Sequence, residues 1–194
     1  MKIKIGINGM GRIGRLVIRS IIERSDKNFE IKHINNRASS EVVASLIKYD
    51  SIHGTLKTKI NSKKNHLIIG DNKISFSQET KIENINWKKY GVDIVFECTG
   101  KFNSKDKVLN HIKNGAKKVI VSAPCENADK TIVYGVNEKV ITKRDKIISA
   151  GSCTTNCLAP VANILHKNFV IKNGFMTTIH AFTSDQRILD NSHK

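Results

Sequence analysis

Cys153 is the residue of this 194-residue chain best placed for nucleophilic chemistry. The apolar run at 147–148 predicts a strand, and the polar run Ser-Cys-Thr-Thr-Asn at 152–156 predicts the start of a helix. Unpaired N–H groups and the macrodipole at a helix N-terminus favour the thiolate, the nucleophilic form of cysteine. Ser152 is a suitable N-cap, which places Cys153 in the first turn. A buried structural cysteine is the alternative, but the neighbours of Cys153 are polar.

His180 is the candidate base for this thiol. The sequence predicts a helix over 153–166, interrupted or kinked by Pro160, and then a strand over 175–181 that carries His180. A helix and an adjoining strand can bring the two side chains together. An imidazolium beside Cys153 would favour the thiolate, and the same ring could take up or return a proton. The alternative is a histidine satisfied within the core of an apolar strand.

A glycine-rich turn near the N-terminus indicates dinucleotide binding. The run Gly-Met-Gly-Arg-Ile-Gly at 9–14 lies between an apolar strand at 3–7 and an amphipathic helix. Gly9 would form the tight turn, Gly11 would let a pyrophosphate approach the backbone, and Gly14 would let the helix pack on the strand. The N–H groups of Arg12 and Ile13 would lie at the helix N-terminus, where an anion binds.

The end of the second strand, predicted at 30–35, bears on the choice of cofactor. The dinucleotide fingerprint calls for an acid there to hold the adenosine ribose, but the chain has Asn36 followed by Arg37. An aspartate would repel a 2′-phosphate, whereas Asn36 and Arg37 can donate hydrogen bonds to one. An ordinary solvated turn is the alternative. The sequence therefore favours NADP, with or without NAD.

The order of the remaining elements predicts an α/β fold, a Rossmann-type doubly wound parallel sheet. Three polar residues follow strand ends, where ligands lie in such sheets, and are candidates for cofactor contact: Thr99, Gly100 and Ser122. We expect a dinucleotide-binding domain over 1–152 and the start of a second domain over 153–194. Further strands or extended segments are predicted at 52–58, 73–76, 92–97, 119–121, 132–136 and 146–149, and helices at 41–48 and 104–114.

The amino-acid composition limits the classes of partner and the compartment that we expect for the protein. The chain has 33 Lys and Arg against 17 Asp and Glu, a net charge of +16 that attracts polyanions or phosphorylated metabolites. The basic residues are scattered and aromatic residues make up 6%, so nucleic acid is not a predicted partner. No apolar run has the length of a membrane span, and four cysteines without a framework spacing indicate a reducing compartment, the cytoplasm. Cys153 and Cys157 lack a second ligand pair, so no metal site is predicted.

Several motifs, in the same order along the chain, resemble those of the phosphorylating glyceraldehyde-3-phosphate dehydrogenases. The run Ser-Cys-Thr-Thr-Asn-Cys-Leu-Ala-Pro at 152–160 is similar to the active-site signature of that family. Further matching runs lie at 6–15, 48–54, 97–100, 122–124 and 176–181.

The resemblance implies an enzyme in which Cys153 attacks the aldehyde of glyceraldehyde 3-phosphate and His180 assists. Hydride transfer to NAD(P) and cleavage of the thioester by inorganic phosphate would give 1,3-bisphosphoglycerate. Ser152 and Thr154 would help to bind the attacking phosphate, and Thr183 the phosphate of the substrate. Ser192 lies where NAD-specific members commonly carry part of a Leu-Pro pair, which again favours NADP. The family also implies a homotetramer.

Members of the family have a longer chain, so we expect this sequence to be the N-terminal part of such an enzyme, with the first helix and strand of a truncated α+β catalytic domain. Two alternatives stay open. One is a related erythrose-4-phosphate dehydrogenase, and the other is an inactive fragment that binds nucleotides or polyanions.

Overall fold

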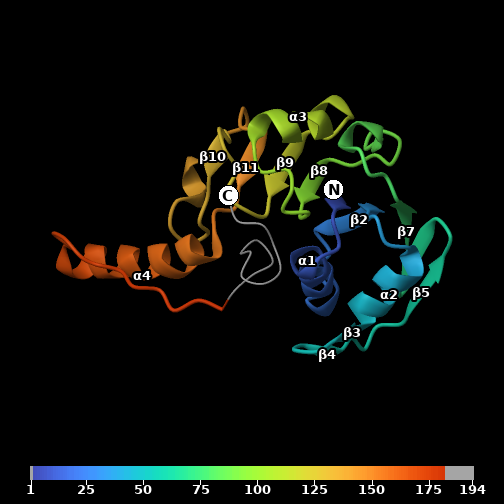
Figure 1. Ribbon diagram of the computed structural model, residues 1–194, viewed down its shortest axis with the longest axis horizontal. Coiled ribbons are helices and arrows are strands. Elements are labelled where there is room, and N and C mark those ends of the chain that lie inside the picture. The colour runs from blue at the N-terminus through green and yellow to red at the C-terminus, as the bar shows by residue number, and fades with distance from the viewer. Residues whose placement is uncertain (1, 182–194) are drawn as a thin grey trace, which may run out of the picture.

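A nine-stranded, mostly parallel sheet forms the centre of the molecule in a computed structural model that describes residues 2–181 (Figure 1). The strand order is β10-β11-β9-β8-β1-β2-β7-β6-β5, and only β6 runs against its neighbours. The strands of this sheet are β1 (Ile3–Asn8), β2 (Phe29–Asn35), β5 (Ile60–Lys63), β6 (His66–Ile69), β7 (Asn72–Ser77), β8 (Ile94–Glu97), β9 (Lys118–Val121), β10 (Lys130–Thr131) and β11 (Ile147–Ser149). A separate antiparallel pair joins β3 (Tyr49–Asp50) to β4 (Gly54–Thr55).

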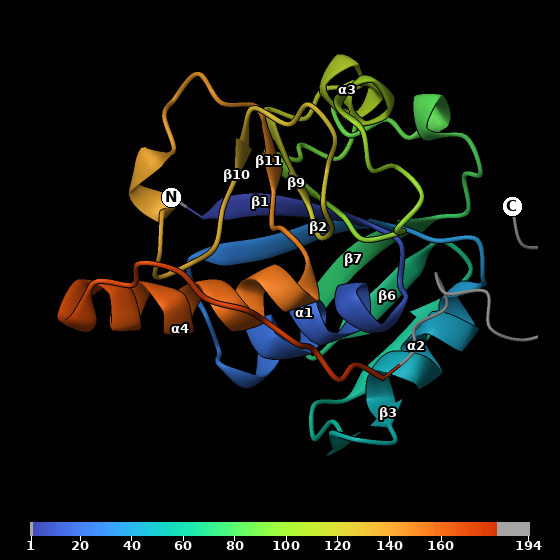
Figure 2. The same ribbon diagram turned by 60° about the vertical axis from the view of Figure 1, so that its left-hand side comes forward.

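Helices cover both faces of the sheet, as the doubly wound prediction requires. Helices α1 (Arg12–Glu23) and α2 (Ser40–Lys48) lie on one face, and α3 (Lys105–Lys113) lies on the other (Figure 2). Two short 3-10 helices span Ile82–Asn84 and Glu138–Val140. The sheet winds in opposite directions from β1, because β1 pairs with β2 on one side and with β8 on the other. This switch point is where ligands bind in open parallel sheets.

Each face of the sheet has its own hydrophobic core. On the side of α1 and α2, the fully buried residues include Ile5, Ile18 and Ile47. On the side of α3, Trp87, Val108 and Val119 are buried in a second cluster. Alternate residues of a strand face opposite sides, so the apolar strands of this sheet supply both clusters. The Rossmann-type fold is confirmed.

Three local predictions need correction. The strand predicted at 132–136 is replaced by β10 at Lys130–Thr131, because the Asn137 side chain draws the backbone into a turn: its Oδ1 accepts from Val133 N at 2.8 Å and its Nδ2 donates to Thr131 O at 3.0 Å. The hairpin strands β5 and β6 were not predicted, because each has only four residues and β5 is mostly polar. The segment at 52–58 is extended only at β4.

Helix α4 (Cys153–Phe169) follows β11 directly and continues through Pro160 without interruption. It projects from the sheet, and the chain after Phe169 runs back along it (Figure 1). The strand predicted at 175–181 does not form: among the described residues this segment pairs with no strand, and Phe175 and Ile179 are fully exposed. A strand requires a hydrogen-bonding neighbour, which residues 2–181 do not provide here. Within the same residues, no helix is both long and apolar enough to cross a membrane.

Candidate active site

Cys153 stands at the carboxyl edge of the sheet because β11 delivers it there. Ala150 N donates to Val121 O at 2.9 Å, and Gly151 N donates to Ser149 Oγ at 3.1 Å, so the link between strand and helix is held to the neighbouring strand end. Ser152 then caps α4, with its Oγ accepting from Thr155 N at 3.0 Å. Cys153 therefore begins the helix, as predicted.

The sulfur of Cys153 lies 3.2 Å from Nε2 of His180. The other ring nitrogen, Nδ1, lies 2.5 Å from the carbonyl oxygen of Ala181 and can only donate to it, which leaves Nε2 facing the thiol. The hydrogen bond from His180 lowers the pKa of Cys153, and the N–H groups at the start of the helix add to this effect. The carbonyl of Ala181, together with Cys153, raises the pKa of His180. The pair is thereby biased toward thiolate and imidazolium.

A cleft of about 440 Å³ surrounds this pair, between α4 and the segment that runs back along it. Thr154 and Cys157 line it from the helix, and residues 176–180 line the other side. Ser152 does not line this cleft, and its hydroxyl is occupied by the cap and by a 2.7 Å contact with Thr155 Oγ1. Thr183 and Ser192, assigned to phosphate and cofactor by the resemblance, lie outside the described residues.

A second cleft, of about 220 Å³, lies over the glycine turn at the switch point of the sheet. Five of the predicted cofactor residues line it: Gly9, Gly11, Asn36, Arg37 and Thr99. Five others do not: Arg12, Ile13, Gly14, Gly100 and Ser122. The two clefts share no lining residue, so the described residues do not bring the thiol and the glycine turn into one cavity.

The geometry of the glycine turn suits a pyrophosphate. Gly9 has a φ of +94°, in the region that favours glycine. A Cβ at Gly14 would lie 2.1 Å from Gly9 O, so α1 can approach the turn this closely only without a side chain there. A Cβ at Gly11 would meet nothing within 4 Å in the described part of the chain, so none of those residues fills the space above the turn. Among residues 2–181 no side chain caps α1, and the first turn of this helix has no acid, so its N–H groups suit an anion.

Asn36 and Arg12 take part in contacts that the sequence did not reveal. Asn36 Oδ1 accepts from Met10 N at 3.1 Å, which ties the end of β2 to the turn and leaves the amide Nδ2 as the group Asn36 can offer a ligand. Arg12 forms an ion pair with Asp50, with 3.4 Å between Nη1 and Oδ2. Backbone N–H groups of His53 and Ile52 lower the pKa of Asp50 to about 2, and Arg12 adds to this.

Sequence reasoning missed several residues around the nucleotide cleft. Met10, Lys101 and Phe102 line it, and Glu97 is buried beneath it. A polar residue that ends a buried strand, as Asn8 and Glu97 do, was the available signal. Among the described residues, no group of three His, Cys, Asp or Glu side chains could hold a metal ion.

A Rossmann-type domain followed by a cysteine and histidine pair at the carboxyl edge of the sheet defines a nucleotide-binding protein that carries a cysteine with a lowered pKa. The sequence profile described as glyceraldehyde 3-phosphate dehydrogenase, NAD binding domain, matches residues 3–105, and the profile for the C-terminal domain of the same enzyme matches residues 152–194. The chain belongs to the glyceraldehyde-3-phosphate dehydrogenase family.

Relatives with high identity carry the same name. A glyceraldehyde-3-phosphate dehydrogenase from Zymomonas mobilis is 49% identical over 194 residues, which are 100% of this chain and 58% of the relative. Glyceraldehyde-3-phosphate dehydrogenase 2 from Bacillus subtilis is 48% identical over 195 residues, covering 100% of this chain and 57% of the relative. The enzyme from Geobacillus stearothermophilus is 47% identical with similar coverage. The chain thus spans a little over half the length of these relatives.

Proposed function

We propose that the protein oxidises glyceraldehyde 3-phosphate to 1,3-bisphosphoglycerate, with inorganic phosphate as second substrate and NAD(P) as hydride acceptor. The observation that carries the proposal is the 3.2 Å contact between Cys153 Sγ and His180 Nε2. The family membership supports the substrate. The names of the relatives do not favour erythrose 4-phosphate, nor a fragment that only binds nucleotides or polyanions.

In this mechanism the Cys153 thiolate attacks the aldehyde carbon and forms a thiohemiacetal. His180 takes the hydroxyl proton as the C–H hydride leaves, and a thioester of Cys153 results. Inorganic phosphate then displaces the sulfur, giving the acyl phosphate and restoring the thiolate. The backbone N–H of Cys153 and the His180 ring would stabilise the oxyanion in both additions, and such donors each contribute about 10²–10³ in rate. When bound, the nicotinamide supplies the hydride acceptor.

The chain's own residues fit a dinucleotide. Gly11 leaves open space where a side chain would stand, and the uncapped start of α1 faces that space. Asn36 and Arg37 line the same cleft, and we propose that they bind the 2′-phosphate of NADP, with Ser192 as a further contact. Backbone groups at Arg12 and Ile13 are proposed to meet the pyrophosphate. Gly100 and Ser122 follow strand ends at the carboxyl edge of the sheet, and we propose them as further contacts of the cofactor although they do not line this cleft.

Phosphate binding and assembly are proposed from the resemblance. Thr154 lines the cleft beside Cys153 and is the candidate for the attacking phosphate, with Ser152 contributing through the cap of α4 and Thr183 binding the substrate phosphate. We also propose a domain boundary between 152 and 153, which the start of the second profile match at 152 supports. A cytoplasmic homotetramer is proposed for the whole enzyme, and sedimentation equilibrium tests the tetramer.

Turnover with purified protein tests the proposal. The protein should reduce NAD(P) in the presence of glyceraldehyde 3-phosphate and phosphate, and Cys153→Ser should abolish this while leaving cofactor affinity nearly unchanged. Cys157→Ser is the matched control, because Cys157 lines the same cleft one helical turn away and has no role in the mechanism. If Cys153→Ser retains turnover, the nucleophile is assigned wrongly.

A further inference from the structure

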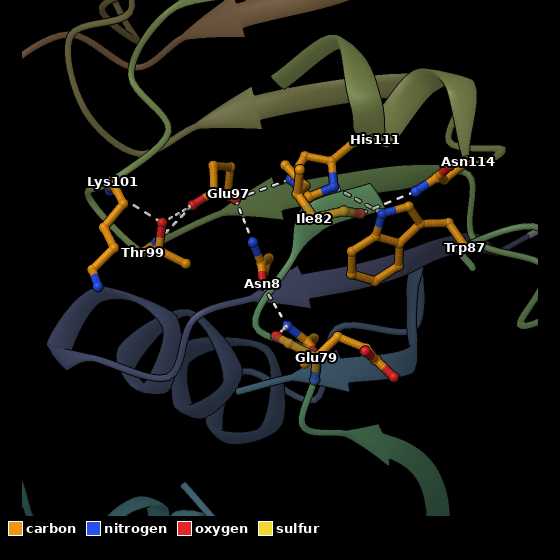
Figure 3. A network of polar contacts seen from close by, with 10 residues as sticks. Asn8, Glu79, Ile82, Trp87, Glu97, Thr99, Lys101, His111 and Asn114 are labelled. Carbon is orange, nitrogen blue, oxygen red and sulfur yellow. Dashed lines mark hydrogen bonds and ion pairs between the residues drawn. The ribbon is translucent and has the colours of Figure 1, made fainter. Parts of the chain in front are cut away.

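A chain of buried polar side chains runs beneath the nucleotide cleft and converges on Glu97, the last residue of β8 (Figure 3). The carboxylate of Glu97 is 1% exposed. Its Oε1 accepts from Thr99 N at 2.8 Å and from Thr99 Oγ1 at 2.5 Å. Its Oε2 lies 2.6 Å from Asn8 Nδ2 and 2.9 Å from His111 Nε2. A buried carboxylate with four partners and no lysine or arginine among them is uncommon and calls for a role.

On one side of Glu97, the direction of the hydrogen bonds follows from Trp87. Its indole Nε1–H can only donate, and it lies 2.8 Å from His111 Nδ1, so Nδ1 must accept. The proton of neutral His111 is therefore on Nε2, which donates it to Glu97. Both side chains are fully buried, and their hydrogen bond lies within the core.

On the other side of Glu97, the hydrogen bonds begin at Glu79, in the segment that follows β7. Glu79 N donates to Asn35 Oδ1 at 2.8 Å, Asn35 Nδ2 donates to Asn8 Oδ1 at 2.9 Å, and Asn8 Nδ2 donates to Glu97. These bonds fix the orientation of both amides. The bonds that link the two arms thus lead toward Glu97, and its two oxygens accept from His111, Asn8 and Thr99.

Glu97 controls the position of a wall of the cleft through Thr99. The Thr99 hydroxyl donates to Glu97 and accepts from Lys101 N at 3.1 Å, so its proton is already used within the protein. Thr99 nevertheless lines the cleft, and its Cγ2 stands 2.8 Å from where a Cβ of Gly9 would be. The loop after β8 therefore packs against the glycine turn. Glu97 holds the two together, because it bonds Thr99 in that loop and Asn8 at the end of β1.

We propose that Glu97 is a positioning residue for the cofactor, one that holds Thr99 and Asn8 so that the cleft over the glycine turn is preformed. This inference rests on the proposed function, because it presumes that NADP or NAD occupies that cleft. The inference also revises the expected role of Thr99. Its hydroxyl bonds Glu97 and so helps to position the wall of the cleft, and it does not contact the cofactor directly.

The test measures binding of NADP and NAD by calorimetry to the full chain and to Glu97→Gln. The amide has nearly the same shape, but whichever oxygen it replaces, an NH₂ group then faces two donors. His111 cannot relieve the conflict by changing tautomer, because Trp87 requires an acceptor at Nδ1. Affinity for the cofactor should fall about tenfold or more, since a hydrogen bond to a charged group is worth roughly that factor. Emission of Trp87, the only tryptophan in the chain, should change as well.

Two controls separate positioning from loss of stability. Glu83→Gln removes an exposed carboxylate that accepts only from Asn110 Nδ2 in the described structure, at 3.0 Å, and should bind the cofactor normally. Leu67→Ala opens a cavity in the other core cluster, which contains no member of the network, and lowers the melting temperature. If Leu67→Ala loses as much affinity as Glu97→Gln at equal loss of melting temperature, Glu97 is merely structural.

Variants of Thr99 keep the inference testable should Glu97→Gln fail to fold. Thr99→Val removes the hydroxyl but keeps the shape and should weaken binding, whereas Thr99→Ser keeps the hydroxyl and should bind nearly normally. Normal binding by Thr99→Val would overturn the inference without any need for Glu97→Gln. Where Glu97→Gln folds, Thr99→Val should add little to it in a double-mutant cycle, because both break the same link. Additive losses would show that Thr99 contacts the cofactor directly and would overturn the inference.

The binding measurements distinguish failure of the proposed function from failure of the inference about Glu97. If the wild-type chain binds neither NADP nor NAD, the proposed function is wrong and the inference falls with it. If the wild type binds and Glu97→Gln binds equally well, only the inference is overturned.

Discussion

The Nε2 atom of His180 lies 3.2 Å from the sulfur of Cys153, although no strand holds the segment that carries His180. The contact is made by an extended segment that runs back along α4, with the carbonyl of Ala181 fixing the other ring nitrogen. The first turn of α4 supplies the N–H groups that a thiolate needs. Both side chains to which the proposed mechanism gives proton transfer thus lie within 153–181.

The lowered pKa of Cys153 predicts that iodoacetamide alkylates this thiol at a lower pH than it does an ordinary thiol. The His180 hydrogen bond favours the thiolate, so the rate should rise with pH at a midpoint below that of an ordinary thiol, about 8.5. His180→Gln should move the midpoint upward because the imidazolium is lost. Burial raises the pKa of Cys98, to about 11, and of Cys125, so neither competes, and Cys157→Ser removes the other exposed thiol. The measurement is the rate of label incorporation at Cys153 by mass spectrometry. An unchanged profile in His180→Gln would contradict the assignment.

Replacement by alanine should destabilise the protein much more at Gly14 than at Gly11. Gly14→Ala places a Cβ 2.1 Å from Gly9 O, a clash between backbone atoms and a side chain that cannot move away. We expect a loss of about 1–3 kcal/mol in the free energy of unfolding. Gly11→Ala meets nothing within 4 Å, and its φ of −68° suits alanine, so stability should fall by less than about 1 kcal/mol.

Cofactor binding should fail in Gly11→Ala because the methyl group occupies the space over the turn. Thermal melting and calorimetric titration of NADP measure the two effects on the same samples. Normal binding by a stable Gly11→Ala protein would show that the pyrophosphate does not approach the turn at that point.

The sequence predicts local chemistry here better than long-range contacts. The roles of Gly9, Gly14 and the cap at Ser152 follow from neighbouring residues, and the structure shows the corresponding geometry. Glu97 escaped prediction because its partners Asn8 and His111 come from distant elements, and only the folded sheet brings their side chains together. The failed strand at 175–181 has the same cause: apolar periodicity gives a tendency to extend, but pairing depends on a neighbour.

Asn36 predicts the cofactor preference. Its Oδ1 is used by Met10 N, so the donor Nδ2 is the group left for a ligand, and Arg37 lines the cleft beside it. NADP should bind at least as well as NAD. Asn36→Asp keeps the bond to Met10 but replaces the donor by a charged acceptor, which should shift the preference toward NAD by about tenfold or more, because like charges repel the 2′-phosphate. The ratio of the two dissociation constants is the measurement, and Asn28→Asp, at a site outside the cleft, is a matched control. A wild-type protein that strongly prefers NAD would contradict this interpretation of Asn36.

The lowered pKa of Asp129 predicts a pH-dependent contribution to the free energy of unfolding. Asp129 lies beside the start of β11, the strand that leads to Cys153. One carboxylate oxygen is bonded to Lys105 of α3, and the other accepts from Lys146 N at 2.7 Å and Ile147 N at 2.9 Å at the start of β11. Burial alone would raise the pKa of Asp129, but the bonds to Lys105 and to the two N–H groups outweigh it and lower the pKa to about 2.

Because the folded-state pKa lies below the unfolded value of about 3.9, this stabilisation is complete above pH ~4 and is lost as the pH falls toward 2. Asp129→Asn should therefore lower stability at neutral pH by about 1 kcal/mol, a value reduced for solvent screening, which corresponds to about 2–4 °C in Tm. The difference from the wild type should shrink steadily below pH ~4, because the wild-type carboxyl is protonated there first in the unfolded state and only near pH 2 in the folded state. Thermal melts of both proteins across this range measure it, with the exposed Asp71→Asn as control. A difference that stays constant down to pH 2 would show that the charge of Asp129 does not stabilise the junction between α3 and β11.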